Sequence, residues 1–408
     1  MERRVRNVIV IGDTAANGGG ASQIACLTAR ILKESGYEVT YFGGCGPIRD
    51  ELSDIRTIVV RESSFIESDS KVCGALEGLH SKASYDALSA LLKEYDPTNT
   101  VVHVHGWTHN LSSSIFDACA DLGFKVVITV HEYFLACPNG GFYNYQAHEI
   151  CHLRPCSLHC VFTNCDKRSY SQKLYRVVRT LRQNRSVARA NPRLCYLSPF
   201  VYGIMRGGRF DDGNPAYLPN PILAPEIVNP SDINQRNGYL FVGRFDPEKN
   251  PRLFCEAMTR LGLHGVMCGS GPQLEALRKE YPKIDFRGWC DKNQLDEQFH
   301  HAKALIMTSS WYEASPLVCL EAMLSAGIPS IVPDTCGATA YIKDGTNGLW
   351  FSNGDLQSLC EAIERMEDRE FYERVCKNID GELPTLRGDR SYAAYARRLS
   401  SIYEGLYV

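Results

Sequence analysis

Short apolar runs alternate with longer segments of helical periodicity along most of this chain of 408 residues. Residues 8–11 form a continuous apolar run, which is typical of a strand buried on both faces of a parallel sheet. Apolar residues then recur at helical spacing from Ile24 to Leu32, Gly36 stands where such a helix would end, and residues 39–42 resume as a strand. This order predicts parallel sheets covered by helices, the α/β class.

The alternating pattern occurs twice, on either side of a Pro- and Asn-rich stretch over residues 218–230 that we interpret as a linker. We expect further strands at residues 101–105, 126–130, 239–242, 266–268, 285–286, 304–307 and 330–332, and a helix over 113–122. The pattern predicts two Rossmann-like domains, over residues 1–220 and 231–389. A last helix, over residues 390–408, lies beyond the second set of strands, and we expect it to pack back on the first domain.

Composition excludes several classes of protein. With 44% apolar and 22% charged residues, the chain has the balance of a globular protein rather than a disordered one. No apolar run reaches the ~18 residues that a membrane-spanning helix needs, and the short run near the start lacks the features of a signal peptide. The 17 cysteines are odd in number and widely scattered, which disfavours a secreted disulfide framework. We therefore expect a cytoplasmic protein with reduced thiols.

Two glutamates with seven residues between them, Glu313 and Glu321, follow the strand expected at residues 304–307. Pro316 suits the first turn of a helix that Ser315 would cap, and Glu321 would lie on that helix. Free amides at a helix start suit a diphosphate, and a carboxylate suits vicinal hydroxyls because it accepts two hydrogen bonds. Isolated glutamates are more often solvated surface residues, so the spacing and the flanking residues carry the argument.

That spacing, with its flanking residues, resembles the paired-glutamate motif of the retaining family 4 glycosyltransferases, the glycosyl transferases group 1 class. Residues 327–334 and 344–348 resemble later segments of the same family. The resemblance implies the GT-B fold, in which two Rossmann-like domains face each other across a cleft and the second binds the donor. It implies that Glu313 holds the hydroxyls of the sugar, that Glu321 binds the ribose, and that Ser315, Pro316 and Leu317 contact the donor.

A second segment, Gly243-Arg244 with Lys249 five residues later, is similar to the diphosphate-binding segment of that family. The resemblance implies that Arg244 and Lys249 bind the donor diphosphate. Negative charge builds on a leaving nucleoside diphosphate, and two cations would stabilise it. No Asp-x-Asp sequence occurs, which disfavours a metal-dependent GT-A enzyme, so we expect no metal and no cofactor. One departure from the family is Ala340, which stands where a glutamate is usual.

Two features of the first domain complete the resemblance. The loop over residues 17–21 contains Gly19 and Gly20 and does not match the dinucleotide pattern Gly-x-Gly-x-x-Gly. It resembles the family's Gly-Gly loop, whose backbone approaches the donor phosphate or the acceptor, although a simple tight turn is the alternative. His131 ends the strand at 126–130 and matches a family histidine placed against the transferred sugar. His105 is a weaker candidate for the acceptor side, and a structural role is the alternative for both.

Five cysteines and three histidines gather between residues 137 and 165: Cys137, Cys151, Cys156, Cys160, Cys165, His148, His152 and His159. This density allows a structural metal, but no Cys-x2-Cys pair is present, so reduced loop thiols are the leading interpretation.

The chain carries a formal charge of −3, yet residues 167–209 hold eleven Lys or Arg and no acidic residue. Six of the basic residues recur at helical spacing: Lys173, Arg176, Arg179, Arg182, Arg185 and Arg189. On a helix they would form a stripe that suits an anionic membrane surface. A solvated helix face or an acceptor phosphate site is the alternative, and nucleic acid is disfavoured because no reader motif accompanies the charge.

Together these features predict a retaining glycosyltransferase that moves a sugar from a nucleotide-sugar donor, a UDP- or GDP-sugar, to an acceptor hydroxyl. The expected acceptor is a glycan or lipid-linked polysaccharide precursor, met on the inner face of the membrane. The alternatives are a non-catalytic relative that binds nucleotide sugar and scaffolds a polysaccharide assembly complex, and a GT-B nucleotide-sugar epimerase or phosphorylase.

Overall fold

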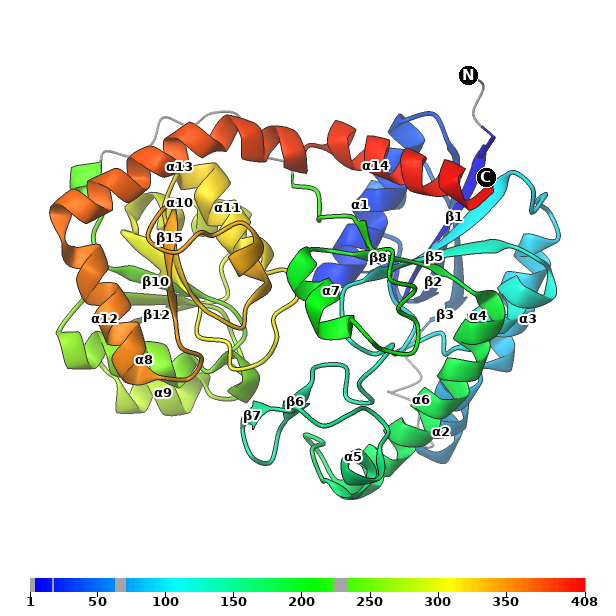
Figure 1. Ribbon diagram of the computed structural model, residues 1–408, viewed down its shortest axis with the longest axis horizontal. Coiled ribbons are helices and arrows are strands. Elements are labelled where there is room, and N and C mark those ends of the chain that lie inside the picture. Colours follow the sequence, from blue (N-terminus) through cyan, green and yellow to red (C-terminus); the bar gives the residue numbers. More distant parts are fainter. Residues whose placement is uncertain (1–3, 17, 63–70, 223–232, 408) are drawn as a thin grey trace. The chain divides into compact units, whose positions relative to one another are not determined.

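The computed structural model describes residues 4–16, 18–62, 71–222 and 233–407. The chain forms two compact units (Figure 1). Unit 1 comprises Met1–Gly141, Leu153–Pro221 and Tyr392–Val408, and unit 2 comprises Phe142–His152 and Ile222–Ser391. Asn17 of the glycine loop and residues 223–230 of the expected linker lie outside the described residues.

Unit 1 is built on a seven-stranded parallel sheet in the order β3-β2-β1-β4-β5-β8-β9. Its strands are β1 (Asn7–Gly12), β2 (Glu38–Cys45), β3 (Arg56–Arg61), β4 (Thr100–Val104), β5 (Lys125–Val130), β8 (Arg193–Tyr196) and β9 (Ala216–Tyr217). Its helices are α1 (Gly20–Glu34), α2 (Lys71–Leu79), α3 (Lys82–Leu92), α4 (Ser114–Asp121), α5 (Leu158–Phe162), α6 (Tyr170–Ala190), α7 (Pro199–Met205) and α14 (Tyr392–Glu404).

Unit 2 is built on a six-stranded parallel sheet in the order β12-β11-β10-β13-β14-β15. Its strands are β10 (Tyr239–Val242), β11 (Gly265–Cys268), β12 (Asp285–Gly288), β13 (Ala304–Ile306), β14 (Ser330–Pro333) and β15 (Gly348–Phe351). Its helices are α8 (Pro251–Leu261), α9 (Leu274–Glu280), α10 (Lys292–His301), α11 (Leu317–Ala326), α12 (Leu356–Glu367) and α13 (Arg369–Arg390). A short antiparallel pair, β6 (Tyr143–Asn144) and β7 (Glu149–Ile150), lies apart from both sheets.

The predicted α/β class with two parallel sheets is confirmed. Each strand expected from an apolar run forms within three residues of its expected bounds, because strands buried on both faces need the continuous apolar residues that make them visible in a sequence. The pattern missed four strands of the two sheets: β3, β8, β9 and β15. The run Arg-Thr-Ile-Val-Val-Arg of β3 lies at the edge of its sheet and is only half-buried.

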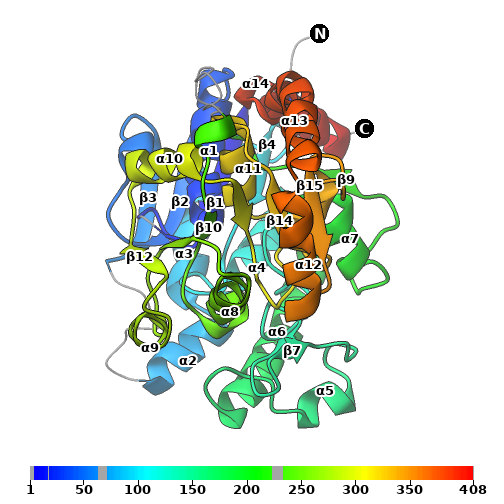
Figure 2. The same ribbon diagram turned by 90° about the vertical axis from the view of Figure 1, so that its left-hand side faces the viewer.

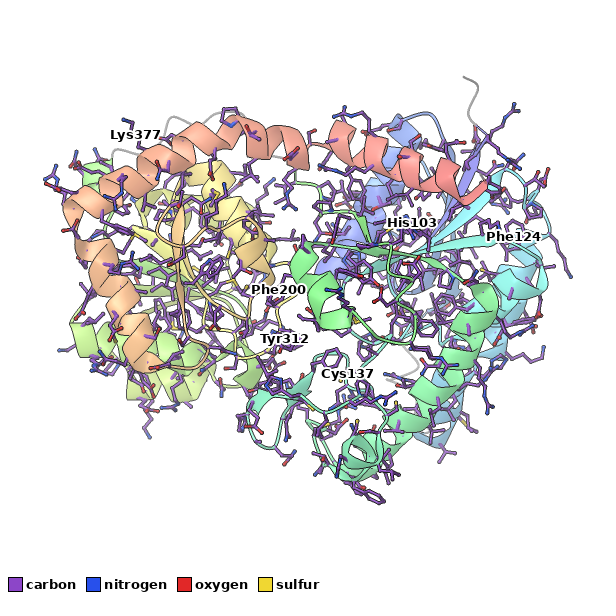
Figure 3. The ribbon with its side chains drawn as sticks, in the orientation of Figure 1. His103, Phe124, Cys137, Phe200, Tyr312 and Lys377 are labelled. Carbon is purple, nitrogen blue, oxygen red and sulfur yellow. The ribbon has the colours of Figure 1, made fainter. Side chains whose placement is uncertain are left out.

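The last helix, α14, packs on unit 1 (Figure 1). The Tyr395 hydroxyl lies 2.9 Å from Thr28 Oγ1 on α1, and the Tyr403 hydroxyl lies 2.6 Å from His103 Nδ1 on β4. Both tyrosines are buried in the apolar core that α1 and the sheet share. Figure 3 shows His103 inside this unit. The C-terminal residues therefore supply part of the core of unit 1.

Residues 142–152 were expected in the first domain, but they belong to unit 2. The chain on both sides of them belongs to unit 1. Tyr143 is buried there, and burial, with the negative charge of Glu248, raises the pKa of its hydroxyl to about 12. No periodicity in the sequence indicates that this short segment belongs to unit 2.

Candidate functional site

Glu313 stands at the centre of a polar cluster on the loop between β13 and α11. Its Oε2 atom lies 2.5 Å from Lys249 Nζ and accepts hydrogen bonds from Trp311 Nε1 at 2.8 Å and from Ser309 Oγ at 3.2 Å. Among the described residues, no hydrogen bond to Oε1 is seen. One oxygen is therefore held by the protein, and the other is the one that a ligand hydroxyl could use.

The electrostatics of this cluster keep Glu313 ionised. Burial disfavours a charged carboxylate, but the positive charge of Lys249 and the three hydrogen bonds outweigh it, so the pKa of Glu313 lies below its ordinary value. Lys249 Nζ also lies 5.5 Å from the centre of the Trp311 ring. The motif placed Glu313 and Lys249 in separate roles, and the structure joins them as an ion pair.

The backbone around Glu313 is held by close packing against the loop after β14. The Gly337 amide donates to the Glu313 carbonyl at 2.7 Å, and a Cβ on Gly337 would lie 2.0 Å from the Ala314 carbonyl oxygen. Only glycine permits this approach. Gly337 therefore fixes the position of the Glu313 loop.

The start of α11 differs from the expectation in one respect. Pro316 occupies the N-cap position, one residue before the helix begins at Leu317, and no side chain caps the helix. The predicted cap by Ser315 is wrong, because the N-cap place falls on Pro316. The first amides of α11 therefore have no side-chain partner, and a helix start of this kind attracts anions.

Arg244 is more exposed than Lys249 and Glu313. Its guanidinium pairs with Asp246 at 2.5 Å and with Glu248 at 3.6 Å. It lines a pocket at the ends of β10, β11 and β12, together with Gly269 and the exposed ring of Trp289. A Cβ on Gly269 would lie 1.8 Å from the carbonyl oxygen of Gly243, so this glycine lets the two loops meet.

Glu321 lies on α11 as expected, and its side chain is exposed. No hydrogen bond or ion pair joins it to Glu313, Lys249 or Arg244 in the described residues. Ala340 is exposed at the end of a 3-10 turn, Gly337–Ala340, where the family's glutamate is missing. The sequence did not single out Trp289 or Trp311, although their places just after a strand were a usable signal.

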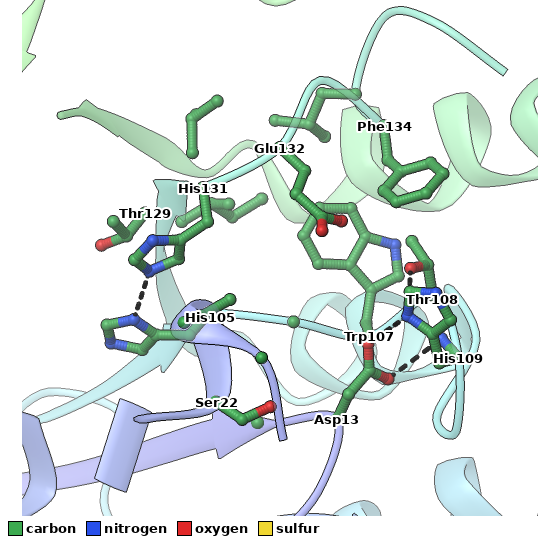
Figure 4. Close-up of a pocket in the computed structure, with 18 residues that line it drawn as sticks. Asp13, Ser22, His105, Trp107, Thr108, His109, Thr129, His131, Glu132 and Phe134 are labelled. Carbon is green, nitrogen blue, oxygen red and sulfur yellow. Dashed lines mark hydrogen bonds and ion pairs between the residues drawn. The ribbon is translucent and has the colours of Figure 1, made fainter. Parts of the chain in front are cut away.

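In unit 1, the carboxyl ends of β1, β4 and β5 surround a pocket (Figure 4). Gly19, Gly20, His105 and His131 all line it. Gly19 is the N-cap of α1, and no side chain caps this helix. The structure therefore brings together the glycine loop and both candidate histidines.

The two histidines lie beside a third, His103, whose ring centre is 4.4 Å from that of His105. His105 Nδ1 lies 2.9 Å from His131 Nε2, and His103 Nε2 lies 2.8 Å from Thr129 Oγ1. Burial lowers the pKa of His131 to about 4, and burial with the charge of His131 lowers that of His103 to about 3. Burial first, and then its two histidine neighbours, lower the pKa of His105 as well. All three rings are therefore neutral at neutral pH.

Asp13 and His109 are pocket residues that the sequence did not single out. Asp13 Oδ1 accepts the backbone amides of His109 and Asn110, and Asp13 Oδ2 lies 3.3 Å from His109 Nδ1 (Figure 4). The hydrogen bond to Asp13 and the charges of Asp13 and Glu132 raise the pKa of His109, against the effect of burial. The pocket therefore contains a carboxylate and an imidazole that can carry charge.

Two cysteines of the cluster contact a lysine. Lys173 Nζ, fully buried, lies 3.1 Å from Cys165 Sγ and 3.3 Å from Cys160 Sγ. Within the described parts of the chain, no group of three or more His, Cys, Asp or Glu side chains is placed to hold a metal ion. An ammonium group thus contacts two of the sulfurs that were candidate metal ligands.

The predicted basic stripe lies on a helix, α6, and several of its basic residues have partners within unit 1. Arg176 pairs with Asp166, and Arg182 and Arg189 pair with Asp117 on α4. Lys173 is buried as well. Most basic residues of the stripe are therefore buried or paired within unit 1, because acidic residues outside the stripe bind its arginines. Among the described residues, no helix is long and apolar enough to cross a membrane.

Comparisons with known proteins agree with this arrangement. Residues 225–380 match the family model described as glycosyl transferases group 1. The chain is 27% identical over 192 residues to the UDP-Gal:alpha-D-GlcNAc-diphosphoundecaprenol alpha-1,3-galactosyltransferase of Escherichia coli, covering 41% of this chain and 48% of that one. It is 29% identical over 185 residues to alpha-D-kanosaminyltransferase of Streptomyces kanamyceticus, covering 42% of this chain and 46% of that one. The matched segments thus span about half the length of these curated relatives.

Solved structures resemble the chain over nearly its whole length. The lipopolysaccharide outer core galactosyltransferase WaaB matches with a TM-score of 0.65 at 16% identity, covering 98% of this chain and 99% of that one. HepE of Anabaena in complex with UDP-glucose matches with a TM-score of 0.64 at 14% identity, over the same shares. At such identities the likeness establishes the fold. The chain thus has the GT-B fold, and its residues 225–380 match the model of the glycosyl transferases group 1 family.

Proposed function

We propose that this chain is a retaining glycosyltransferase that transfers a sugar from a UDP- or GDP-sugar to a hydroxyl of a glycan or lipid-linked acceptor. The observation that carries the proposal is the ion pair of Lys249 with Glu313, in the matched domain and next to the uncapped start of α11. The printed names of the relatives support the substrate class. One is a galactosyltransferase that uses a diphosphoundecaprenol acceptor, and one solved neighbour holds UDP-glucose.

Each residue has a chemical task in this proposal. Glu313, kept ionised by Lys249, accepts hydrogen bonds from the sugar hydroxyls with its Oε1 atom. Arg244 and the backbone amides of Ser315 and Leu317 face the donor diphosphate, and Pro316, which has no N–H to donate, contacts the donor through its ring. Lys249 holds Glu313 and adds positive charge beside the leaving phosphate.

The remaining assignments concern Glu321 and unit 1. Glu321 binds the ribose hydroxyls. His131, neutral because of its low pKa, offers a hydrogen bond rather than a charge to the transferred sugar. Gly19 and Gly20 present the uncapped start of α1 to the ligand. Retention of configuration follows from front-face attack, in which the departing phosphate takes the proton of the acceptor hydroxyl.

A thermal-shift screen against UDP-, GDP- and ADP-sugars tests the donor assignment. We expect one nucleotide class to raise the melting temperature of the wild-type chain, and Glu313→Ala and Arg244→Ala to lose both this shift and sugar transfer while keeping the fold. Lys343→Ala, an exposed lysine paired with Glu382 in the same unit, serves as the control and should behave as wild type. Near-normal transfer by Glu313→Ala or Arg244→Ala would refute the assignment.

A further inference from the structure

One lysine of unit 1 is buried against sulfur rather than against a carboxylate. Lys173 is 0% exposed, and its Nζ atom contacts Cys165 Sγ at 3.1 Å and Cys160 Sγ at 3.3 Å. In the described part of the chain no ion pair joins Lys173 to an acidic residue, and the nearest acidic residue in sequence, Asp166, pairs with Arg176. A buried ammonium without a counter-charge is strongly disfavoured. The sulfurs are therefore the groups that supply the negative charge.

The sulfur of Cys165 has two hydrogen-bond donors. Lys173 Nζ lies 3.1 Å from it, and the buried Asn139 Nδ2 donates to it at 3.1 Å. Asn139 Nδ2 also donates to the Cys165 carbonyl at 2.8 Å, which fixes the position of this residue. A sulfur that carries a negative charge is a better acceptor than a neutral thiol. Cys165 is therefore the sulfur best placed to be the thiolate.

The pKa of Lys173 agrees with an ammonium–thiolate pair. Burial lowers the pKa of a lysine, because it disfavours the charged form. The hydrogen bonds and charges of Cys165 and Cys160 outweigh burial here, and the pKa of Lys173 lies above its ordinary value. A thiolate beside a lysine is the form of cysteine that reacts with peroxides.

The pair connects two neighbouring elements of unit 1. Lys173 lies near the start of α6, Cys160 lies on α5, and Cys165 lies on the segment between them. Helices α5 and α6 contact each other and lie together in two views (Figures 1 and 2). A link between Cys165 and Lys173 would therefore tie this segment to α6.

A small oxidant can reach the pair through its surroundings. Cys165 and Cys160 are 4% and 5% exposed, whereas Cys156 is half-buried. Burial and the charge of Cys160 raise the pKa of Cys156, against the charge of Lys173, so this more accessible thiol lies near the pair. Helix α5 has only five residues, and brief local opening of so short an element admits a molecule of the size of hydrogen peroxide.

We propose that Cys165 is a peroxide-sensitive site, at which oxidation joins its sulfur to Lys173 Nζ by a sulfur–nitrogen bond, a sulfenamide. In the first step the thiolate takes an oxygen atom from hydrogen peroxide, the O–O bond breaks, and one water leaves a sulfenate, S–O⁻. In the second step Nζ bonds to sulfur and the S–O bond breaks, and two protons of the ammonium leave with that oxygen as a second water. The sulfur loses two electrons, which the peroxide accepts.

The geometry favours nitrogen over the second sulfur as the partner of oxidised Cys165. Nζ already contacts Cys165 Sγ, whereas no hydrogen bond joins Cys160 Sγ to Cys165 Sγ within the described residues. A thiol that attacks the sulfur of a sulfenamide releases the amine, so the link is reversible by reducing agents. The proposal stands independently of sugar transfer.

Peptide mapping of the full chain tests this proposal. Wild type is treated with hydrogen peroxide, its free thiols are alkylated in denaturant, and the chain is digested with trypsin. We expect a cross-linked peptide that contains Cys165 and Lys173, about 2 Da lighter than its two reduced parts and uncleaved after Lys173. Dithiothreitol should release the two parts. Cys195 is the matched internal control: it is 0% exposed, burial raises its pKa to about 12, and it should stay alkylatable in the same sample.

Two variants separate the roles of the neighbours. Cys160→Ser keeps the nitrogen and the sulfur of the pair, so it should form the link as wild type does. Lys173→Met removes the nitrogen and should form no link. Because Lys173→Met changes a buried site and can affect folding, the wild-type map and Cys160→Ser decide the proposal by themselves.

Three results would overturn the proposal. The first is a disulfide between Cys160 and Cys165 in oxidised wild type in place of the link to Lys173. The second is Cys165 that remains a free thiol, or gains oxygen without joining Lys173, after peroxide treatment. The third is loss of the link in Cys160→Ser, because the second sulfur would then be the reacting partner.

Discussion

At the scale of single residues, the site depends on pairs that the sequence does not show as pairs. Lys249 and Glu313 are 64 positions apart, and each was expected in its own role, yet they share an ion pair 2.5 Å long. The motif could indicate both residues because their chemical types suit a sugar nucleotide. It could not indicate their pairing, because contact between distant loops is set by the packing of β10, β13 and α11.

The histidines of unit 1 make stability depend on pH. His103 is fully buried, and burial lowers its pKa to about 3, against about 6.5 when unfolded. The unfolded chain therefore binds a proton that the folded chain does not, so stability is lost as pH falls below about 6.5. Lowering the pH from 7.5 to 5 should reduce the free energy of unfolding by about 2 kcal/mol through this one group.

Urea unfolding of unit 1 at the two pH values measures this cost. The variant His103→Gln keeps a polar side chain that cannot titrate. Its free energy of unfolding should therefore fall by about 2 kcal/mol less than that of wild type over the same pH interval. Equal losses in the two proteins would show that His103 does not carry the effect.

At the scale of elements, sequence periodicity predicted the positions of strands and helices. It predicted less well which face of a helix contacts the rest of the protein. The buried strands were visible as apolar runs. For α6, the basic residues were expected to form a stripe for an anionic membrane surface, but Asp117, on a helix more than sixty residues earlier, binds Arg182 and Arg189. Tertiary packing determines which residues a helix face contacts, and the periodicity of the sequence does not predict those contacts.

The loop that carries Glu313 depends on one glycine. In Gly337→Ala, the added Cβ would meet the Ala314 carbonyl oxygen at 2.0 Å, so the loop must move. We expect a loss of about 1–3 kcal/mol of stability from this overpacking, with weaker donor binding. Gly381→Ala is the matched control, because nothing lies within 4 Å of its added Cβ.

Thermal unfolding and nucleotide-sugar titration of both variants give the comparison. Gly381→Ala, which lies on α13, should keep wild-type donor affinity. Donor affinity that Gly337→Ala retains in full would show that the position of this loop does not matter for binding.

At the scale of the whole molecule, the chain combines a GT-B fold with a site whose charged groups lie at strand and helix ends. The resemblance in motif predicted the fold class and the transferase domain, because parallel sheets gather loops at the carboxyl ends of their strands. The motif could not predict features specific to this chain. Among them are the contacts of Lys173 with two cysteines and the exposed apolar residues of α5 and α6.

The measurement that tests the central claim most directly is transfer of a labelled sugar from the donor class found by thermal shift to a lipid-linked or glycan acceptor. Wild type should form labelled product. Lys249→Met should form it about 10²–10³-fold more slowly, because the cation beside the leaving phosphate and the partner of Glu313 are both lost. Donor binding without any product from wild type, or equal rates for the two proteins, would contradict the account.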